Sequence, residues 1–206
     1  MGIPVYFKTL VTQYQDDILV KKPLSDVQSL FFDLNCLIHP CCKSVSDTGI
    51  VDEAQMIDTV IHYVETLIAY TDAKTLVYIA IDGVCPKAKM KQQRERRHKS
   101  AYEAKKWDTN AISPGTEFMR RLNLRIREWM DIYEGNPQII LSDSSEPGEG
   151  EHKILEYLRG HPTKGKTVIY GLDADLVMLG LVSGINNLYL LRERTAYNIE
   201  DTESPY

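Results

Sequence analysis

The sequence has no apolar run long enough to cross a membrane. Its 206 residues are 43% hydrophobic, but no stretch reaches the roughly 18 consecutive apolar residues that a membrane-spanning helix needs. Residues 1–7 also lack the charged and apolar regions of a secretory signal peptide. These absences disfavour a membrane-bound or secreted protein. They predict an intracellular location, with the cytoplasm favoured over the nucleus, and no membrane partner.

Cysteine is scarce and clustered. Three of the four cysteines, Cys36, Cys41 and Cys42, lie within seven residues, and the fourth is Cys85. Adjacent cysteines make a poor disulfide framework, so free thiols in a reducing compartment are expected. His39 lies close to Cys41 and Cys42, but no second pair of ligands follows, which disfavours a zinc site.

An excess of positive charge is also lacking, because the net charge is −5. This disfavours a general nucleic-acid coat protein. The basic residues are nevertheless concentrated between Pro86 and Trp107, where nine lysines and arginines are opposed by two glutamates. Such a segment in an acidic protein predicts a local anion-binding site.

Short apolar runs alternate with helical patterns, and there is no internal repeat or low-complexity segment. The runs that predict buried strands are 29–34, 75–81, 138–141, 167–170 and 188–191. The segments that predict helices are 2–14, 53–70, 87–106, 114–130 and 154–158. This alternation predicts one α/β domain over residues 1–206, with a mainly parallel central sheet flanked by helices.

Carboxylates follow four of the predicted strands. They are Asp33, Asp82, the pair Glu149 and Glu151, and the pair Asp173 and Asp175. Because ligands bind at the carboxyl ends of parallel strands, we expect all six to converge. Helix N-caps would explain one pair alone equally well, but not why each strand ends in the same way. Six such charges require cations, and two divalent ions such as Mg²⁺ can together bind a phosphodiester.

The predicted basic helix adds a possible phosphate site. Lys89, Gln93, Arg96 and Arg97 have the spacing of one helix face, and their donors suit a phosphate. A solvated basic face is the commoner interpretation of such a pattern. The short separation from Asp82 favours a terminal-phosphate pocket instead. His39 could stack on a base, although from the residues alone a buried, hydrogen-bonded histidine is favoured.

These residues together resemble the N-terminal catalytic region of the Xrn family of 5′→3′ exoribonucleases, relatives of the flap endonucleases. The matching segments are 1–4 with Phe7, 32–35 with Ile38 and His39, 81–94, 112–119, 147–153, 170–180 and 191–193. They are collinear and span nearly the whole chain. The resemblance implies a PIN-like, flap-nuclease-like version of the α/β fold.

The resemblance also implies roles for individual residues. Mg²⁺ or Mn²⁺, at two sites, would be held by Asp33, Asp82, Glu149, Glu151, Asp173 and Asp175, with Asn35 in support. A 5′-monophosphate would be held by Lys89, Gln93, Arg96 and Arg97, and His39 would stack on the first base. The implied substrate is single-stranded RNA with a 5′-monophosphate, degraded processively to mononucleotides.

The sequence departs from the family near its C-terminal end. No Gly-Asn-Asp-Phe-Leu-Pro-type motif, which would supply a further metal-binding aspartate, occurs before Tyr206. The segments that roof the active site are not found either. We therefore expect an incomplete second metal site and a further polypeptide that completes it. The alternative function is a nuclease-derived module that binds RNA 5′ ends or a partner protein with weak or no cleavage. No residue identified here distinguishes RNA from DNA.

Overall fold

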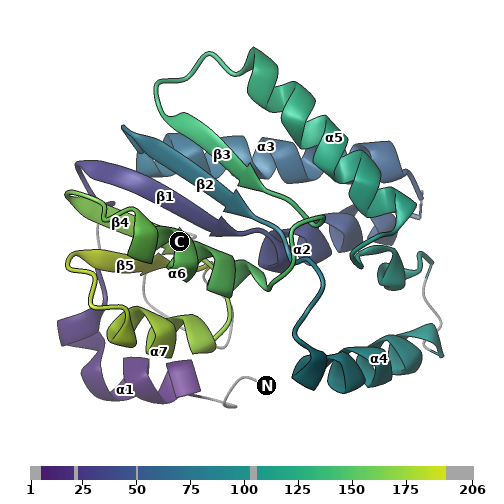
Figure 1. Ribbon diagram of the computed structural model, residues 1–206, viewed down its shortest axis with the longest axis horizontal. Coiled ribbons are helices and arrows are strands. Elements are labelled where there is room, and N and C mark those ends of the chain that lie inside the picture. The colour runs from purple at the N-terminus through teal and green to yellow at the C-terminus, as the bar shows by residue number, and fades with distance from the viewer. Residues whose placement is uncertain (1–5, 21–22, 50, 103–105, 194–206) are drawn as a thin grey trace.

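The central element is a parallel β-sheet. The computed structural model describes residues 6–20, 23–49, 51–102 and 106–193 (Figure 1). The sheet contains five strands in the order β3-β2-β1-β4-β5, and every neighbouring pair is parallel. The strands are β1 (Val27–Asp33), β2 (Leu76–Ala80), β3 (Gln138–Ser142), β4 (Lys166–Tyr170) and β5 (Leu188–Leu191). This confirms the predicted α/β fold with a parallel sheet.

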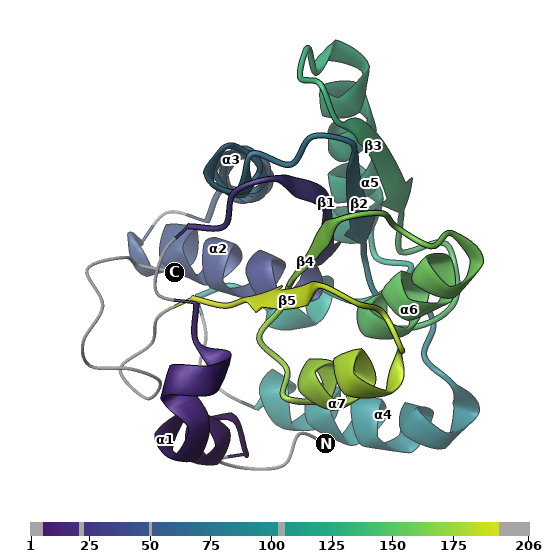
Figure 2. The same cartoon turned by 90° about the vertical axis from the view of Figure 1, so that its left-hand side faces the viewer.

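Helices cover both faces of the sheet. The helices within the described residues are α1 (Tyr6–Ile18), α2 (Asn35–Asp47), α3 (Glu53–Thr71), α4 (Lys87–Ala101), α5 (Glu117–Ile132), α6 (Gly150–Gly160) and α7 (Asp175–Val182), with a short 3-10 turn η1 (Thr109–Ala111). Seen along the sheet, α2 and α3 lie on one side and α6 on the other (Figure 2). Within the described ranges, no helix combines the length and apolarity needed to span a membrane.

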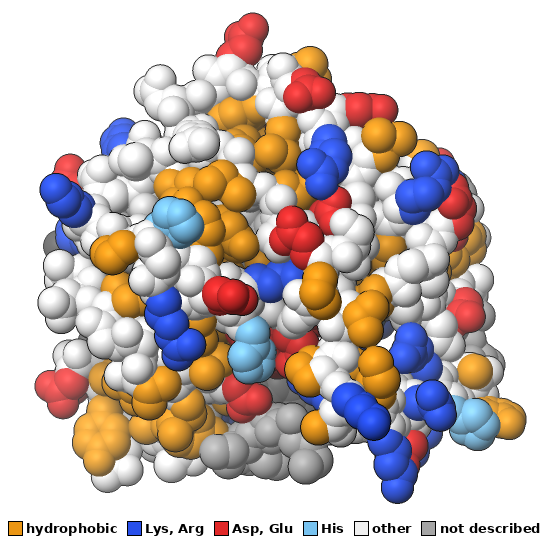
Figure 3. All heavy atoms as spheres, in the orientation of Figure 1, with side chains coloured by type: hydrophobic (Ala, Val, Ile, Leu, Met, Phe, Trp, Pro, Cys, Tyr) orange, Lys and Arg blue, Asp and Glu red, His pale blue; other side chains and the backbone are white. Residues whose placement is uncertain are grey.

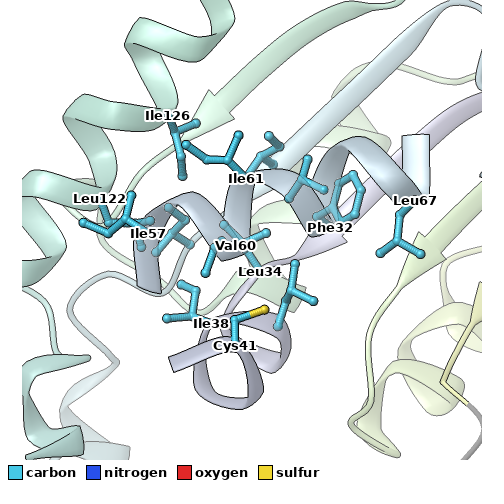
Figure 4. Packing of buried hydrophobic residues seen from close by; sticks show 14 of the residues in the cluster. Phe32, Leu34, Ile38, Cys41, Ile57, Val60, Ile61, Leu67, Leu122 and Ile126 are labelled. Atoms are coloured by element: carbon cyan, nitrogen blue, oxygen red, sulfur yellow. The ribbon is translucent and has the colours of Figure 1, made fainter. Parts of the chain in front are cut away.

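Successive side chains of β1 point to opposite faces of the sheet and pack into two different hydrophobic cores. Leu30 and Phe32 point into the larger core, which α2, α3 and α5 complete (Figure 4). Phe31, between them, points into the smaller core with residues of α6 and α7. All three side chains are fully buried, as expected for a strand covered on both faces. Because both faces are filled mainly with apolar side chains, the carboxylates of this region lie at or beyond the ends of β1 and β2.

Some predicted boundaries were wrong. The basic helix ends at Ala101 rather than at residue 106, and Trp107 beyond it is buried and packs edge-on against Phe118. The first helix runs to Ile18 with a non-helical residue at Tyr14, and residues 1–5 lie outside the described ranges. Helices α2 and α7 were not predicted as separate elements. Pro40 lies inside α2, and its missing N–H donor disfavours helix in a sequence pattern.

Two leucines of α5 provide a test of the packing. Leu122 is fully buried and Leu124 is 50% exposed, although both lie within the predicted helix over residues 114–130. Leu122→Ala should lower the free energy of unfolding by about 2–5 kcal/mol, because it leaves a cavity in the larger core. Leu124→Ala should change it by no more than about 0.5 kcal/mol. Urea unfolding measures both, and equal losses would contradict this packing.

Candidate metal and phosphate site

The carboxyl ends of β1 and β2 bring buried carboxylates to one edge of the sheet. Asp33 is the last residue of β1 and lies level with Ala80 of β2, two residues before Asp82. Asp33 is only 4% exposed. Glu149 is the N-cap of α6 and Glu151 lies in its first turn, and both are buried. Negative charge at a helix N-terminus is favourable, but so many carboxylates together repel one another.

The electrostatics of Asp33 show how closely these groups are gathered. Burial raises the pKa of Asp33 well above its ordinary value of 3.8, and the negative charges of Asp82, Glu151, Asp173 and Glu149 raise it further. Four of the other five predicted carboxylates therefore lie near enough to influence the charge of Asp33. The sixth, Asp175, is half-buried at the first residue of α7.

Two further carboxylates, Asp82 and Glu151, have raised pKa values. Burial raises the pKa of Asp82, and the hydrogen bond from the Gly150 N–H, at 2.7 Å from Asp82 Oδ1, offsets part of this rise. Burial likewise raises the pKa of Glu151. Gly150 permits the close approach, because a Cβ atom there would lie 2.5 Å from Asp33 Oδ1. The glycine between the two glutamates is thus required by the cluster itself.

Two buried carboxylate oxygens have no hydrogen-bond partner among the described residues. They are Asp33 Oδ1 and Glu149 Oε1. Burying a charged oxygen without a partner is costly unless a cation compensates for it. Oxygen-rich, acidic sites are what Mg²⁺ and Mn²⁺ prefer. The donor set therefore fits a hard divalent cation.

His152 is a neighbour of this cluster that the sequence did not single out. Its Nδ1 atom lies 3.9 Å from a carboxylate oxygen of Glu149 and 3.9 Å from one of Glu151. Potential ligand atoms of these three residues lie within 4.8 Å of one another. His152 is exposed, so it lies at the outer edge of the cluster. Its position directly after Glu151 was the only available signal.

Lys89 contacts the carboxylate cluster and does not line the cavity with Gln93, Arg96 and Arg97. Its Nζ atom forms an ion pair with Glu149 Oε2 at 2.6 Å. Partial burial alone would lower the pKa of Lys89, but the hydrogen bond and the charge of Glu149 outweigh it, so the pKa is raised. A lysine ammonium thus supplies part of the positive charge that the cluster requires.

The other predicted phosphate ligands line a cavity between α2 and α4. Its volume is about 920 Å³. The residues of the predicted site that line it are His39, Gln93, Arg96 and Arg97. In Figure 3, lysine and arginine side chains gather at the lower right, where Figure 1 places α4, and acidic and histidine side chains lie nearer the centre. Basic side chains of α2 and α4, among them Lys43, Arg96 and Arg97, therefore line part of the cavity.

Arg192 holds the loop that carries Asp173. Its guanidinium donates to the Leu172 carbonyl and, at 3.4 Å, to the Asp173 carbonyl. It also lies 4.1 Å from the centre of the Phe7 ring, a cation–π contact. Asn35 plays a similar part at β2, because its Oδ1 atom accepts from the Asp82 N–H at 3.0 Å. The four cysteines, in contrast, are free thiols, as the sequence predicted.

The fold and the site together indicate the class of domain to which this chain belongs. A parallel α/β domain that gathers carboxylates at the ends of its strands is consistent with a PIN-like nuclease domain. The family profile "XRN 5'-3' exonuclease N-terminus" matches residues 1–106 and 99–194. The chain therefore belongs to this family, which confirms the resemblance.

Individual relatives agree with this assignment. The chain is 35% identical to 5'-3' exoribonuclease 2 of Schizosaccharomyces pombe, over 88% of this chain and 22% of that protein. It is 35% identical to 5'-3' exoribonuclease 2 of Emericella nidulans, over 94% of this chain and 25% of that protein. For human 5'-3' exoribonuclease 1 the identity is 31%, over 98% and 14%. The chain thus spans a quarter or less of the length of these relatives.

The crowded carboxylates should destabilise the cation-free protein. Asp33→Asn removes one negative charge at nearly constant volume. In EDTA at pH 8 it should therefore raise Tm by about 2–4 °C, equivalent to about 1 kcal/mol for a chain of this size. Asp131→Asn, at an exposed position on α5, should leave Tm unchanged. A lower Tm for Asp33→Asn would contradict this electrostatic account.

The raised pKa of Asp33 also sets the sign of a pH dependence. Between the ordinary pKa of 3.8 and the higher folded value, the folded state binds more protons than the unfolded state. The contribution of Asp33 to stability therefore falls as pH rises through this window and is lowest above it. The Tm difference between Asp33→Asn and the parent should grow as pH rises from 4 to 8. A difference that shrinks over this range would show the opposite sign of coupling.

Proposed function

We propose that this domain is a divalent-metal-dependent 5′→3′ exoribonuclease that acts on 5′-monophosphorylated RNA and releases mononucleotides. The observation that carries the proposal is the cluster of buried carboxylates around Asp33, in which Asp33 and Glu149 each have an oxygen without a hydrogen-bond partner in the described part of the chain. Membership of the XRN family and the names of the relatives support the reaction class.

Two groups of carboxylates would hold the cations. Asp33, Asp82, Glu149 and Glu151 form the first group, and Asp173 and Asp175 form the second. Mg²⁺ or Mn²⁺ bound there would neutralise the charge that develops on the attacking and leaving oxygens and favour deprotonation of the attacking water. The protein itself contributes dry surroundings for the first group, three of whose members are at most 8% exposed.

The basic cavity would hold the 5′ end. Gln93, Arg96 and Arg97 present donors to a terminal phosphate, while His39 stacks on the first base. Lys89 lies one turn before Gln93 on α4 and contacts Glu149. It therefore links the cavity to the carboxylates, and its ammonium would turn to the phosphate when a cation replaces it at Glu149. In this proposal the first phosphodiester would lie beside the acidic cluster.

One observation supports a second candidate, namely binding of RNA 5′ ends with weak cleavage. Asp173 is exposed, whereas Asp33, Glu149 and Glu151 are buried. An exposed carboxylate attracts a cation less strongly, because water screens its charge. The second cation would then need millimolar Mn²⁺ or a further polypeptide. Turnover by the 206-residue chain, compared with its RNA affinity, distinguishes the two candidates. The intracellular location and such a partner stay predictions.

The metal proposal is tested by Glu151→Gln, which removes charge at nearly constant volume. We expect Mn²⁺-dependent release of mononucleotides from 5′-phosphorylated RNA to fall at least about 100-fold, because one cation is held less well. The matched control is Glu156→Gln, at an exposed position on the same helix. It should retain parental activity, and circular dichroism should show both variants folded. Parental activity in Glu151→Gln would overturn the assignment of this residue.

The phosphate proposal is tested on two RNAs that differ only at the 5′ end. Arg96→Ala and Arg97→Ala should weaken binding of 5′-phosphorylated RNA about tenfold or more, and 5′-hydroxyl RNA much less. The reason is that a charge-assisted contact to a terminal phosphate is lost only where that phosphate exists. Arg94→Ala is the control, because Arg94 is exposed on α4 and does not line the cavity.

Fluorescence anisotropy at fixed salt measures both affinities. Equal weakening of the two RNAs by Arg96→Ala would mean that α4 follows the phosphate backbone without reading the 5′ end.

A further inference from the structure

Lys153 is a buried lysine beside the carboxylate cluster. It is 7% exposed, and lysines are rarely buried unless the ammonium is paired. Its Nζ atom donates to the Ile81 carbonyl at 2.7 Å and to the Asp143 carbonyl at 2.8 Å. These carbonyls lie just after β2 and β3. Lys153 therefore ties the first turn of α6 to the two loops that follow these strands.

The Ile81 carbonyl belongs to the peptide group that precedes Asp82. The N–H of the same peptide group donates to Asn35 Oδ1 at 3.0 Å. The group is thus held on both sides, by Lys153 at its oxygen and by Asn35 at its nitrogen. Because a peptide group is planar, these two hydrogen bonds restrict the orientation from which the Asp82 side chain extends. The Asp82 carboxylate itself accepts from the Gly150 N–H at 2.7 Å.

The stem of Lys153 is placed by the loop that leads to Glu149. A Cβ atom on Gly148 would lie 3.6 Å from Lys153 Cγ. Gly148 has a φ of 112°, in the region that favours glycine. It also bonds to the loop after β2, accepting from the Gly83 N–H at 2.8 Å and donating to the Val84 carbonyl at 3.0 Å. The direction of the lysine side chain is therefore determined by packing.

We propose that Lys153 and Asn35 are positioning residues that clamp the peptide group between Ile81 and Asp82 and so orient the Asp82 carboxylate for a divalent cation. This rests on the metal-dependent function proposed above. A positioning role and a purely electrostatic role of Lys153 predict opposite changes in cation affinity when its ammonium is removed. Through its charge alone, the ammonium repels a nearby cation, so its removal would tighten cation binding. Through positioning, its removal weakens cation binding, because Asp82 loses its fixed orientation.

The test replaces Lys153 by methionine, which keeps a similar length without the charge or the donors. In the 206-residue chain, Lys153→Met should weaken Mn²⁺ binding in titration calorimetry about tenfold or more, within the range typical of residues that support metal ligands. Without metal, exchange of the Asp82 amide hydrogen should become faster. Lys166→Met is the matched control. Lys166 donates to the Ser25 carbonyl at 2.7 Å and begins β4, at the opposite end of the sheet.

Each possible result either supports or overturns the proposed clamp by Lys153 and Asn35. Unchanged or tighter Mn²⁺ binding by folded Lys153→Met overturns the proposal, as does an effect of the same size in Lys166→Met. If Lys153→Met does not fold, Asn35→Ala carries the test, and Mn²⁺ affinity equal to that of the parent overturns the clamp. If the parent itself binds no Mn²⁺, the metal-dependent function fails. The clamp is then tested only by the exchange rate of the Asp82 amide hydrogen in Lys153→Met, and a rate equal to that of the parent rejects it.

Discussion

Repulsion among buried carboxylates is the constraint on which the rest of this structure depends. Asp33 lies at the end of a strand that is apolar on both faces, and four other carboxylates act on its charge. Such a cluster persists only where the surrounding fold supplies partners. The partners present are the Gly150 N–H and the ammonium of Lys89, and the charge of Lys153 also favours the ionised form of Asp82. In the proposed function, a cation would compensate for the oxygens of Asp33 and Glu149 that have no hydrogen-bond partner among the described residues.

The parallel sheet and the basic helix meet at this point for a topological reason. Parallel strands all end at one edge, so every loop that follows a strand reaches the same region. Helix α4 follows β2 after a short connection, which brings Lys89 to Glu149 and leaves the later residues of α4 to line the cavity with His39. In the proposed function, Lys89 would connect a terminal phosphate in that cavity with the acidic cluster.

The strands could be predicted from the sequence because their apolar residues are consecutive, and this pattern is a local property of the chain. Strand segments buried on both faces require apolar runs, and the runs at β1 through β5 were found close to their bounds. The carboxylates were found as well, since they interrupt or follow these runs. Helix α2 was missed because Pro40 lies within it, and the end of α4 was missed because its basic pattern continues into a segment that packs differently, at Trp107.

The sequence by itself determined the fold class and the acidic residues that follow the strands, because strand burial and residue type are local properties. Only the tertiary structure decided which groups meet. It paired Lys89 with Glu149, placed His152 at the edge of the cluster and left Asp173 exposed. It also brought Lys153 and Asn35 to one peptide group. These contacts join residues up to 72 positions apart in the sequence. They form because α6 and α2 pack against the sheet, and no local sequence pattern specifies them.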